Sequence, residues 1–416
     1  MTQPQPSTFT AIIKPLTECN LACTYCSVWE KKWERMPLPL MERILDQVSS
    51  YAMSVFGPDV ETNAMFHGGE PLMMGLDYYE KALDAIKRLQ DAGRKIVPSF
   101  QTNASLIDER YADFFQRNGC GLSISLDGPR DIHDAARTSK RGAGSYDAVI
   151  RGLGLLQERG LDPWVCTVLR KDSIDRLTEI YEHLRDLGIR KVYLLSLYPA
   201  GDGANVINDL GIPAEQWSQA LAALFDRWCL DERRIPMVDP LSKIVTNLQG
   251  TQQRGCVANN KCVSGSVGFM PDGGVFPCAV LTGADPFFYG NIRTQDLGEI
   301  MQNSVRTRLL DRHQQLPQTC MDCPFISFCR GGCMHQSYTR NGSPYTFANY
   351  CEKELFVHIE QQLLVNGYFS PIDRRAIIAR RLDSAGFVPY NNRSFLRKIG
   401  TPKTPTIQAS GEEVKS

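Results

Sequence analysis

Cysteine spacing constrains this chain more than any other feature of its sequence. Fourteen cysteines occur among 416 residues, and most of them fall into two groups. The first group is a C-x3-C-x2-C run made by Cys19, Cys23 and Cys26, and the second places eight cysteines between Cys256 and Cys351. Clustered cysteines in a reducing compartment bind metal more often than they form disulfides. The sequence therefore predicts metal centres.

The composition narrows the class of protein and its partners. Lys plus Arg and Asp plus Glu both number 46, so the formal net charge is zero. That balance argues against a dedicated nucleic-acid-binding protein. No apolar run approaches the roughly 18–20 residues needed to cross a bilayer, and residues 1–6 lack the pattern of an export signal. We therefore expect a cytoplasmic protein that binds neither nucleic acid nor membrane.

Strand-like and helix-like segments alternate through the first half of the chain. The expected strands cover 9–15, 62–66, 96–101, 121–126, 163–169 and 192–197. Helical patterns of 10–15 residues lie between them, which indicates βαβ units and a parallel sheet. This α/β pattern fits a partial (β/α)6 barrel or an open doubly wound sheet. In both folds the chemistry lies at the carboxyl ends of the strands.

The second half of the chain has a different pattern. We expect a Gly- and Asn-rich loop over 201–209, then a helix over 214–231, then a loop-rich region that carries the eight later cysteines. The expected domains are a barrel over 1–235, a small metal-held domain over 236–355, and a C-terminal helical extension with a flexible tail over 356–416. A basic helix is expected at 371–381.

The first cysteine group has the chemistry of an open iron–sulfur cluster. Three thiolates on one short loop hold three irons of a cubane and leave the fourth iron open for a substrate or cofactor. A zinc site usually takes four ligands, and no fourth Cys or His lies nearby in the sequence.

This run, with Tyr25 before its last cysteine, resembles the signature of radical S-adenosylmethionine enzymes. The resemblance implies a partial (β/α)6 barrel and a [4Fe-4S] cluster whose open iron chelates S-adenosylmethionine. Reductive cleavage then gives a 5′-deoxyadenosyl radical that removes a hydrogen atom from the substrate.

Further motifs fit the cofactor site of this family. The segment 68–71 resembles its GGEP motif, whose Glu accepts a hydrogen bond from the ammonium group of the cofactor. Residues after the fourth strand match positions that contact the methionine carboxylate and the ribose. The cofactor-binding residues that the resemblance implies are Tyr25, Gly68, Gly69, Glu70, Ser125, Asp127 and Arg137. A surface ion pair at Arg137 and simple contact of Tyr25 with the cluster remain alternatives.

The later cysteines resemble a SPASM domain, which carries two auxiliary [4Fe-4S] clusters. The implied ligands of the first are Cys256, Cys262, Cys278 and Cys333, and those of the second are Cys320, Cys323, Cys329 and Cys351. Structural zinc is the alternative. We thus expect three [4Fe-4S] clusters, S-adenosylmethionine, and a flavodoxin- or ferredoxin-type electron donor. Cys120, Cys166 and Cys229 are expected to be buried apolar residues.

The overall layout is similar to that of anaerobic sulfatase-maturating enzymes, but three positions depart from it. Ala279 replaces an Asp, His67 replaces a Gln, and Val28 replaces a Tyr. The HGGEP form resembles SPASM enzymes that modify ribosomally made precursor peptides. We therefore expect a peptide maturase that forms a cross-link, a desaturation or an epimer. Formylglycine formation, radical dehydrogenation or epimerisation of a small molecule such as an aminoglycoside, and a non-enzymatic electron carrier are the alternatives.

The candidate catalytic residues are His67, Gln101 and Asn103. His67 is a candidate base, a substrate contact or a support for the GGEP loop. Gln101 and Asn103 end a strand and are expected to bind the substrate backbone, with 201–209 at the rim. Eighteen residues before Cys19 are too few for a leader-binding domain. Binding of a leader in the precursor peptide is then expected to come from a separate protein or from the basic stretch 372–399, or not to occur.

Overall fold

The strands predicted for the first half of the chain form one continuous parallel sheet. A computed structural model describes residues 8–28, 34–197, 200, 203–249, 261–347 and 351–366. Each strand is parallel to the next in chain order, through β1 (Thr8–Ile13), β2 (Glu61–Phe66), β3 (Ile96–Thr102), β4 (Gly121–Ser125), β5 (Trp164–Leu169) and β6 (Lys191–Ser196). Because this order never reverses, the partial (β/α)6 barrel is confirmed, and the doubly wound alternative is wrong.

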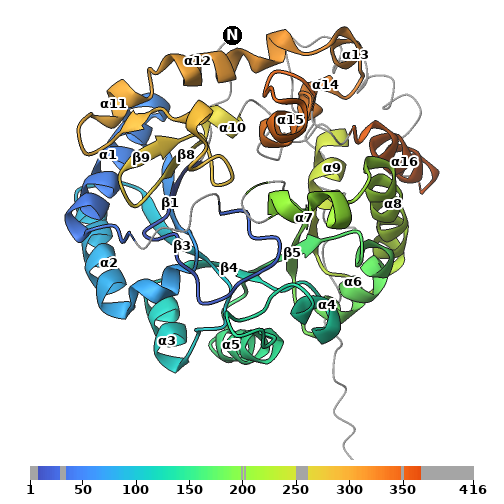
Figure 1. The fold of residues 1–416 in the computed structure, drawn as a ribbon, viewed down its shortest axis with the longest axis horizontal. Helices are drawn as coiled ribbons and strands as arrows, with labels where there is room; N and C mark the ends of the chain where they lie inside the picture. The colour runs from blue at the N-terminus through green and yellow to red at the C-terminus, as the bar shows by residue number, and fades with distance from the viewer. Residues whose placement is uncertain are drawn as a thin grey trace, which may run out of the picture.

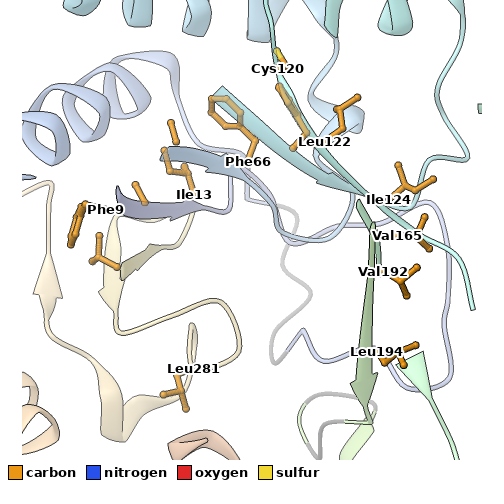
Figure 2. Close-up of a cluster of buried hydrophobic side chains, with 14 of the residues drawn as sticks. Phe9, Ile13, Phe66, Cys120, Leu122, Ile124, Val165, Val192, Leu194 and Leu281 are labelled. Carbon is orange, nitrogen blue, oxygen red and sulfur yellow. The ribbon is translucent and has the colours of Figure 1, made fainter. Parts of the chain in front are cut away.

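Helices cover the outer face of the curved sheet (Figure 1). They are α1 (Leu38–Phe56), α2 (Leu76–Asp91), α3 (Glu109–Arg117), α4 (Arg130–Asp134), α5 (Tyr146–Glu158), α6 (Leu177–Asp186) and α8 (Ala214–Leu230). Side chains alternate along each strand, so one set faces these helices and the other faces the interior. The Phe66 ring packs on Tyr79 of α2 at 5.2 Å, and Figure 2 shows Phe66, Ile124 and Val165 in this outer core.

The expected loop at 201–209 is wrong over its described part, which forms helix α7 (Gly203–Leu210). Val206, Ile207 and Leu210 on this helix pack against a small buried group that includes Tyr25. Tertiary contact here overrides the low helix propensity of Gly and Asn. The helix therefore lies beside a predicted cofactor residue.

The cysteine-rich region is more regular than its sequence suggests, and it extends the barrel sheet. β8 (Ser266–Phe269) pairs in parallel with β1, followed by the antiparallel β9 (Gly274–Phe276) and β10 (Gly290–Asn291). β7 (Met237–Asp239) extends the opposite edge beyond β6. The described residues thus form a ten-stranded sheet that joins the two predicted domains.

Short helices complete this region and lie next to the barrel opening (Figure 1). They are α9 (Leu241–Leu248), α10 (Lys261–Ser264), α11 (Leu297–Ile300), α12 (Ser304–Leu310), α13 (Gln318–Met321), α14 (Ile326–Cys329), α15 (Met334–Asn341) and α16 (Lys353–Val365). Helix α16 packs on α8, where Trp217 Nε1 donates to Glu352 at 3.1 Å. The basic helix expected at 371–381 and the expected tail lie outside the described residues. Among the helices that the structure describes, none is long and apolar enough to span a membrane.

Candidate active site

The loop that carries the first three cysteines is held by the segment that follows β2. His67 N donates to Ile13 O at 2.8 Å, Gly69 N to Leu16 O at 3.1 Å, and Glu70 N to Glu18 O at 2.8 Å. These bonds continue the parallel pairing of β1 and β2 beyond the ends of both strands. The GGEP segment therefore fixes the chain up to the residue before Cys19.

Glycine is required at two positions of this segment because the cysteine loop approaches so closely. A Cβ on Gly68 would lie 2.1 Å from Leu16 O, and a Cβ on Gly69 would lie 1.9 Å from Glu18 O. Gly68 also has a φ of +127°, which L side chains rarely adopt. Backbone contact within the protein thus accounts for both glycines.

Glu70 links the GGEP segment to the end of β3. Its fully buried carboxyl accepts hydrogen bonds from Leu72 N at 3.0 Å, Thr102 Oγ1 at 2.7 Å and Asn103 N at 2.7 Å. Burial raises the pKa of Glu70 to about 7, although these bonds oppose that rise. A carboxylate offers about four acceptor positions, so one remains for the predicted ammonium contact.

The three thiols share one enclosed environment. Burial raises the pKa of Cys19 to about 12, and negative charge on Glu70, Cys23 or Cys26 would raise it further. Leu21 N lies 3.4 Å from Cys19 Sγ as a donor and opposes the shift. Three thiolates crowded in this way need a cationic centre between them, so the donor set fits the predicted cluster.

Within the described ranges, no three His, Cys, Asp or Glu side chains converge as the ligands of one metal ion do. A cubane needs a wider arrangement, because each thiolate binds its own iron.

Asp127 joins two other predicted cofactor residues into one buried group. Its carboxylate accepts hydrogen bonds from Arg137 Nε at 3.0 Å, from Arg137 Nη2 at 3.1 Å and from the Tyr25 hydroxyl. Burial alone would raise the pKa of Asp127, but Arg137 holds it below its usual value. Asp127 and Arg137 both act on the thiol of Cys23, so this group lies beside the cysteine loop. The buried ion pair excludes the surface alternative for Arg137.

The later cysteines that the structure describes share charged neighbours. Charges on Cys351 and Cys323 act on Cys320, and charges on the same two act on Cys329, so these four lie together. Cys262 and Cys278 both act on Tyr289, and Cys262 and Cys333 both act on Arg312. Cys256 lies outside the described residues. The described members of the second implied set are therefore close to one another. Arg312 does not distinguish the two sets, because Cys329 and Cys320 also act on it.

Two family models match the chain at these sites. The model described as the radical SAM superfamily matches residues 13–184, and the SPASM model, described as an iron–sulfur cluster-binding domain, matches residues 256–324. Together they cover more than half of the sequence. The chain belongs to the radical S-adenosylmethionine enzymes with a SPASM domain. Such an enzyme uses [4Fe-4S] clusters and S-adenosylmethionine.

Curated relatives of this radical enzyme include anaerobic sulfatase-maturating enzymes. A serine-type enzyme of Bacteroides thetaiotaomicron is 27% identical over 84% of this chain and 88% of its own length. A cysteine-type enzyme of Clostridium novyi is 25% identical over 77% of this chain and 87% of its own length.

Solved structures share the fold. AnSMEcpe with bound AdoMet has a TM-score of 0.76 at 22% identity and covers 88% of this chain and 99% of its own. SuiB of Streptococcus suis, bound to its precursor peptide SuiA, has a TM-score of 0.60 at 16% identity. The match covers 82% of this chain and 74% of the SuiB chain.

The side-chain amide of Asn103 has no hydrogen-bonding position left for a substrate. Its Nδ2 lies 3.5 Å from Cys19 Sγ and 2.9 Å from Asn20 Oδ1, and its Oδ1 accepts from Ser105 N and Ser105 Oγ. An amide side chain makes four such bonds at most. The geometry therefore assigns Asn103 to the cysteine loop and disfavours the expected substrate contact.

His67 is better placed to donate a proton in a hydrogen bond than to accept one. Its Nδ1 accepts from Gly68 N at 2.7 Å, and burial with the nearby Lys14 lowers its pKa to about 4. The ring is therefore neutral at pH 7 and carries its proton on Nε2. Of the alternatives for His67, this favours a substrate contact or loop support over a general base.

Gln101 and Ser125 alternate along β3 and β4 with residues of the outer core, so they face the barrel interior. Gln101 Nε2 lies 3.4 Å from Ser125 Oγ, and Gln101 Oε1 accepts from Cys166 Sγ at 3.3 Å. All three side chains are half-buried. Cys166 thus lies on the polar interior wall, while Cys120 is buried in the apolar core as expected.

Sequence reasoning missed Arg170, which follows β5. This arginine is 2% exposed, and its Nη1 lies 3.9 Å from Asp127 Oδ2 without a hydrogen-bond partner. Its guanidinium also lies 5.9 Å from the Tyr25 ring centroid. The position of Arg170 at the carboxyl end of a barrel strand was the available signal.

Proposed function

We propose that this radical enzyme modifies a ribosomally made peptide and forms a cross-link, a desaturation or an epimer. The observation that carries the proposal is the polar interior wall of Gln101, Ser125 and Cys166, whose half-buried side chains are hydrogen-bonded across β3, β4 and β5. Support comes from SuiB and anSMEcpe, which share the fold and were both solved with bound peptides.

Each group of side chains has a distinct part in this proposal. Cys19, Cys23 and Cys26 hold the radical cluster, and Glu70 and Arg137 orient the cofactor. When bound, the clusters and S-adenosylmethionine supply a 5′-deoxyadenosyl radical and accept the electron released by the peptide. The interior wall holds the peptide bond or side chain that is attacked. A flavodoxin- or ferredoxin-type donor, and a separate leader-binding protein, are the partners of this proposal.

Formylglycine formation is the second candidate, and it is favoured by the names of the curated relatives. The residue after Cys278 opposes it. Ala279 has no proton acceptor on its side chain, where the resemblance places an Asp as base, and its carbonyl accepts from Thr282 Oγ1 at 2.6 Å. The peptide maturase therefore remains the first candidate.

Mass spectrometry of a co-expressed candidate precursor peptide tests the proposal. A loss of two mass units on one residue pair supports a cross-link or desaturation. A peptide whose mass is unchanged after reaction in H2O, but which gains one mass unit after reaction in D2O, supports an epimer. A sulfatase-derived Ser or Cys peptide, tested in parallel, reports formylglycine formation. The variant Cys23→Ala is the control and should abolish every product. A precursor unchanged in mass and deuterium contradicts the proposal and moves attention to a small molecule.

A further inference from the structure

Two buried cations lie among the cysteines proposed as cluster ligands. Lys14 follows β1 and is 3% exposed, and Arg312 follows α12 and is 6% exposed. Within the described part of the chain, neither forms an ion pair with a carboxylate. Buried charges are normally paired or serve a bound group, so both positions need an explanation.

Lys14 lies between the cysteine loop of the radical cluster and the first auxiliary set. Its backbone N donates to Phe269 O of β8 at 2.9 Å, while the neighbouring Ile13 O accepts from His67 N. β8 leads through a tight turn to β9 and Cys278, and the Lys14 ammonium interacts with Cys278 and, more weakly, with Cys26. These two cysteines belong to different proposed clusters.

Arg312 lies between the two auxiliary sets and ties one ligand loop together. Its guanidinium donates to the carbonyls of Arg330 at 2.9 Å, Gly331 at 3.1 Å and Gly332 at 2.9 Å, which connect Cys329 to Cys333. Its other acceptors are Pro344 O, Thr346 O and Ser337 Oγ. The cysteines that its charge reaches come from both sets and are Cys333, Cys262, Cys329 and Cys320.

We propose that Lys14 and Arg312 separate the three clusters electrostatically and raise the reduction potentials of the clusters they face. Adding an electron makes a cluster more negative, so a nearby buried cation stabilises the reduced form. Lys14 acts chiefly on the first auxiliary cluster, and Arg312 acts on both auxiliary clusters. The inference rests on the cysteine assignments of the proposed function.

Anaerobic redox titration of the reconstituted full-length protein, followed by electron paramagnetic resonance, tests the role of Lys14. In Lys14→Met, the reduced-to-oxidised ratio of the first auxiliary cluster at a fixed potential should fall about tenfold, which equals 59 mV for one electron. Lys14→Arg should retain the wild-type potential. The matched control is Lys243→Met, because Lys243 pairs instead with Asp239 at 2.7 Å. Unchanged potentials in Lys14→Met would overturn the proposal.

Two further measurements separate the possible failures. S-adenosylmethionine should alter only the signal of the radical cluster, since only that cluster has an open iron. A wild-type protein that binds well below about twelve irons overturns the cysteine assignments, and the inference with them, before any variant is made. For Arg312, a potential retained in Arg312→Lys and lowered in Arg312→Met supports the charge effect. An equal fall in the reduction potential of both variants, or a loss of iron from both variants, overturns the proposed charge effect.

Discussion

The side-chain amide of Asn103 lies 3.5 Å from the sulfur of Cys19 and donates to it, although 84 residues separate them in the chain. The same amide nitrogen donates to Asn20 Oδ1 at 2.9 Å, so the contact orients the loop as well as the sulfur. Hydrogen bonds to cluster sulfurs are one of the factors that set reduction potential. Asn103 is therefore a positioning residue for the proposed radical cluster.

Replacing this donor should lower the potential of the radical cluster. In Asn103→Asp the side chain keeps its shape but presents a carboxylate to the Cys19 thiolate. The reduced cluster is then less stable, and a smaller fraction should be reduced by a fixed amount of dithionite. Resonance spectra with and without S-adenosylmethionine measure that fraction, and iron analysis checks that the cluster is retained. If the reduced fraction of the cluster in Asn103→Asp equals that of the wild-type protein, the contact does not influence the cluster.

Removing the Arg170 guanidinium should weaken cofactor binding. Its Nη1 has no hydrogen-bond partner and lies 3.9 Å from Asp127 Oδ2, and we expect it to bind an anionic oxygen of the cofactor. A hydrogen bond to a charged group contributes about 1.5–3 kcal/mol, so Arg170→Met should raise the Kd of S-adenosylmethionine about tenfold or more. Equilibrium binding to the reconstituted protein measures this, and equal affinity would exclude the contact.

Adding one methyl group at Gly69 should cost the enzyme its radical cluster. The Cβ of Gly69→Ala would lie 1.9 Å from Glu18 O, so the cysteine loop must move. Iron content should fall from about twelve to about eight per chain, because the auxiliary sites are distant in sequence. Gly154→Ala on α5 is the control, since its added Cβ meets nothing within 4 Å. Normal iron content in both variants would contradict the proposed fit of the two loops.

The free energy of unfolding should fall in acid because the His133 ring is buried in its neutral form. The ring is fully buried, and burial lowers its pKa to about 4, while the unfolded chain titrates near 6.5. Between these values the unfolded state binds the extra proton, so stability is lost as pH falls below about 6.5, by up to about 3 kcal/mol. Thermal unfolding from pH 7.5 to 5 should show this slope, and His133→Gln should make it less steep; His67 and His335, whose pKa values burial also lowers to about 4, should account for the remainder. The comparison variant is His358→Gln, at a half-buried histidine that lies 2.9 Å from Asp226 Oδ1, and it should leave the part of the slope caused by His133 in place. Equal slopes in all three proteins would refute the assignment.

Local patterns made most of the barrel and the cysteine loop predictable. Buried residues alternate with less buried ones along β2 to β6, and the GGEP segment and Asp127 follow strand ends. The helix Gly203–Leu210 and strand β8 were not predictable, because their stability comes from contacts with distant residues. Ser266–Phe269 is too short to identify alone, and it is a strand because β1 lies beside it.

Side-chain partners in the site were less predictable than its position. Gly69, Glu70 and Asp127 were predicted to bind the cofactor, and the structure places them near the cysteine loop, with protein partners that the sequence did not indicate. Asn103 was assigned to substrate because its partner Cys19 is distant in sequence. Arg170 has no motif around it, and only the three-dimensional structure places it beside Asp127.

The pairing of β1 with β8 has a consequence for how the chain is made. Thr10 is opposite Ser266, so about 250 further residues must be synthesised before the second edge of the first strand is paired. Throughout synthesis of the barrel, that edge presents unpaired backbone groups, which are a template for pairing with other chains. The ribosome must release the cysteine-rich region before the earliest strand of the protein is protected from aggregation.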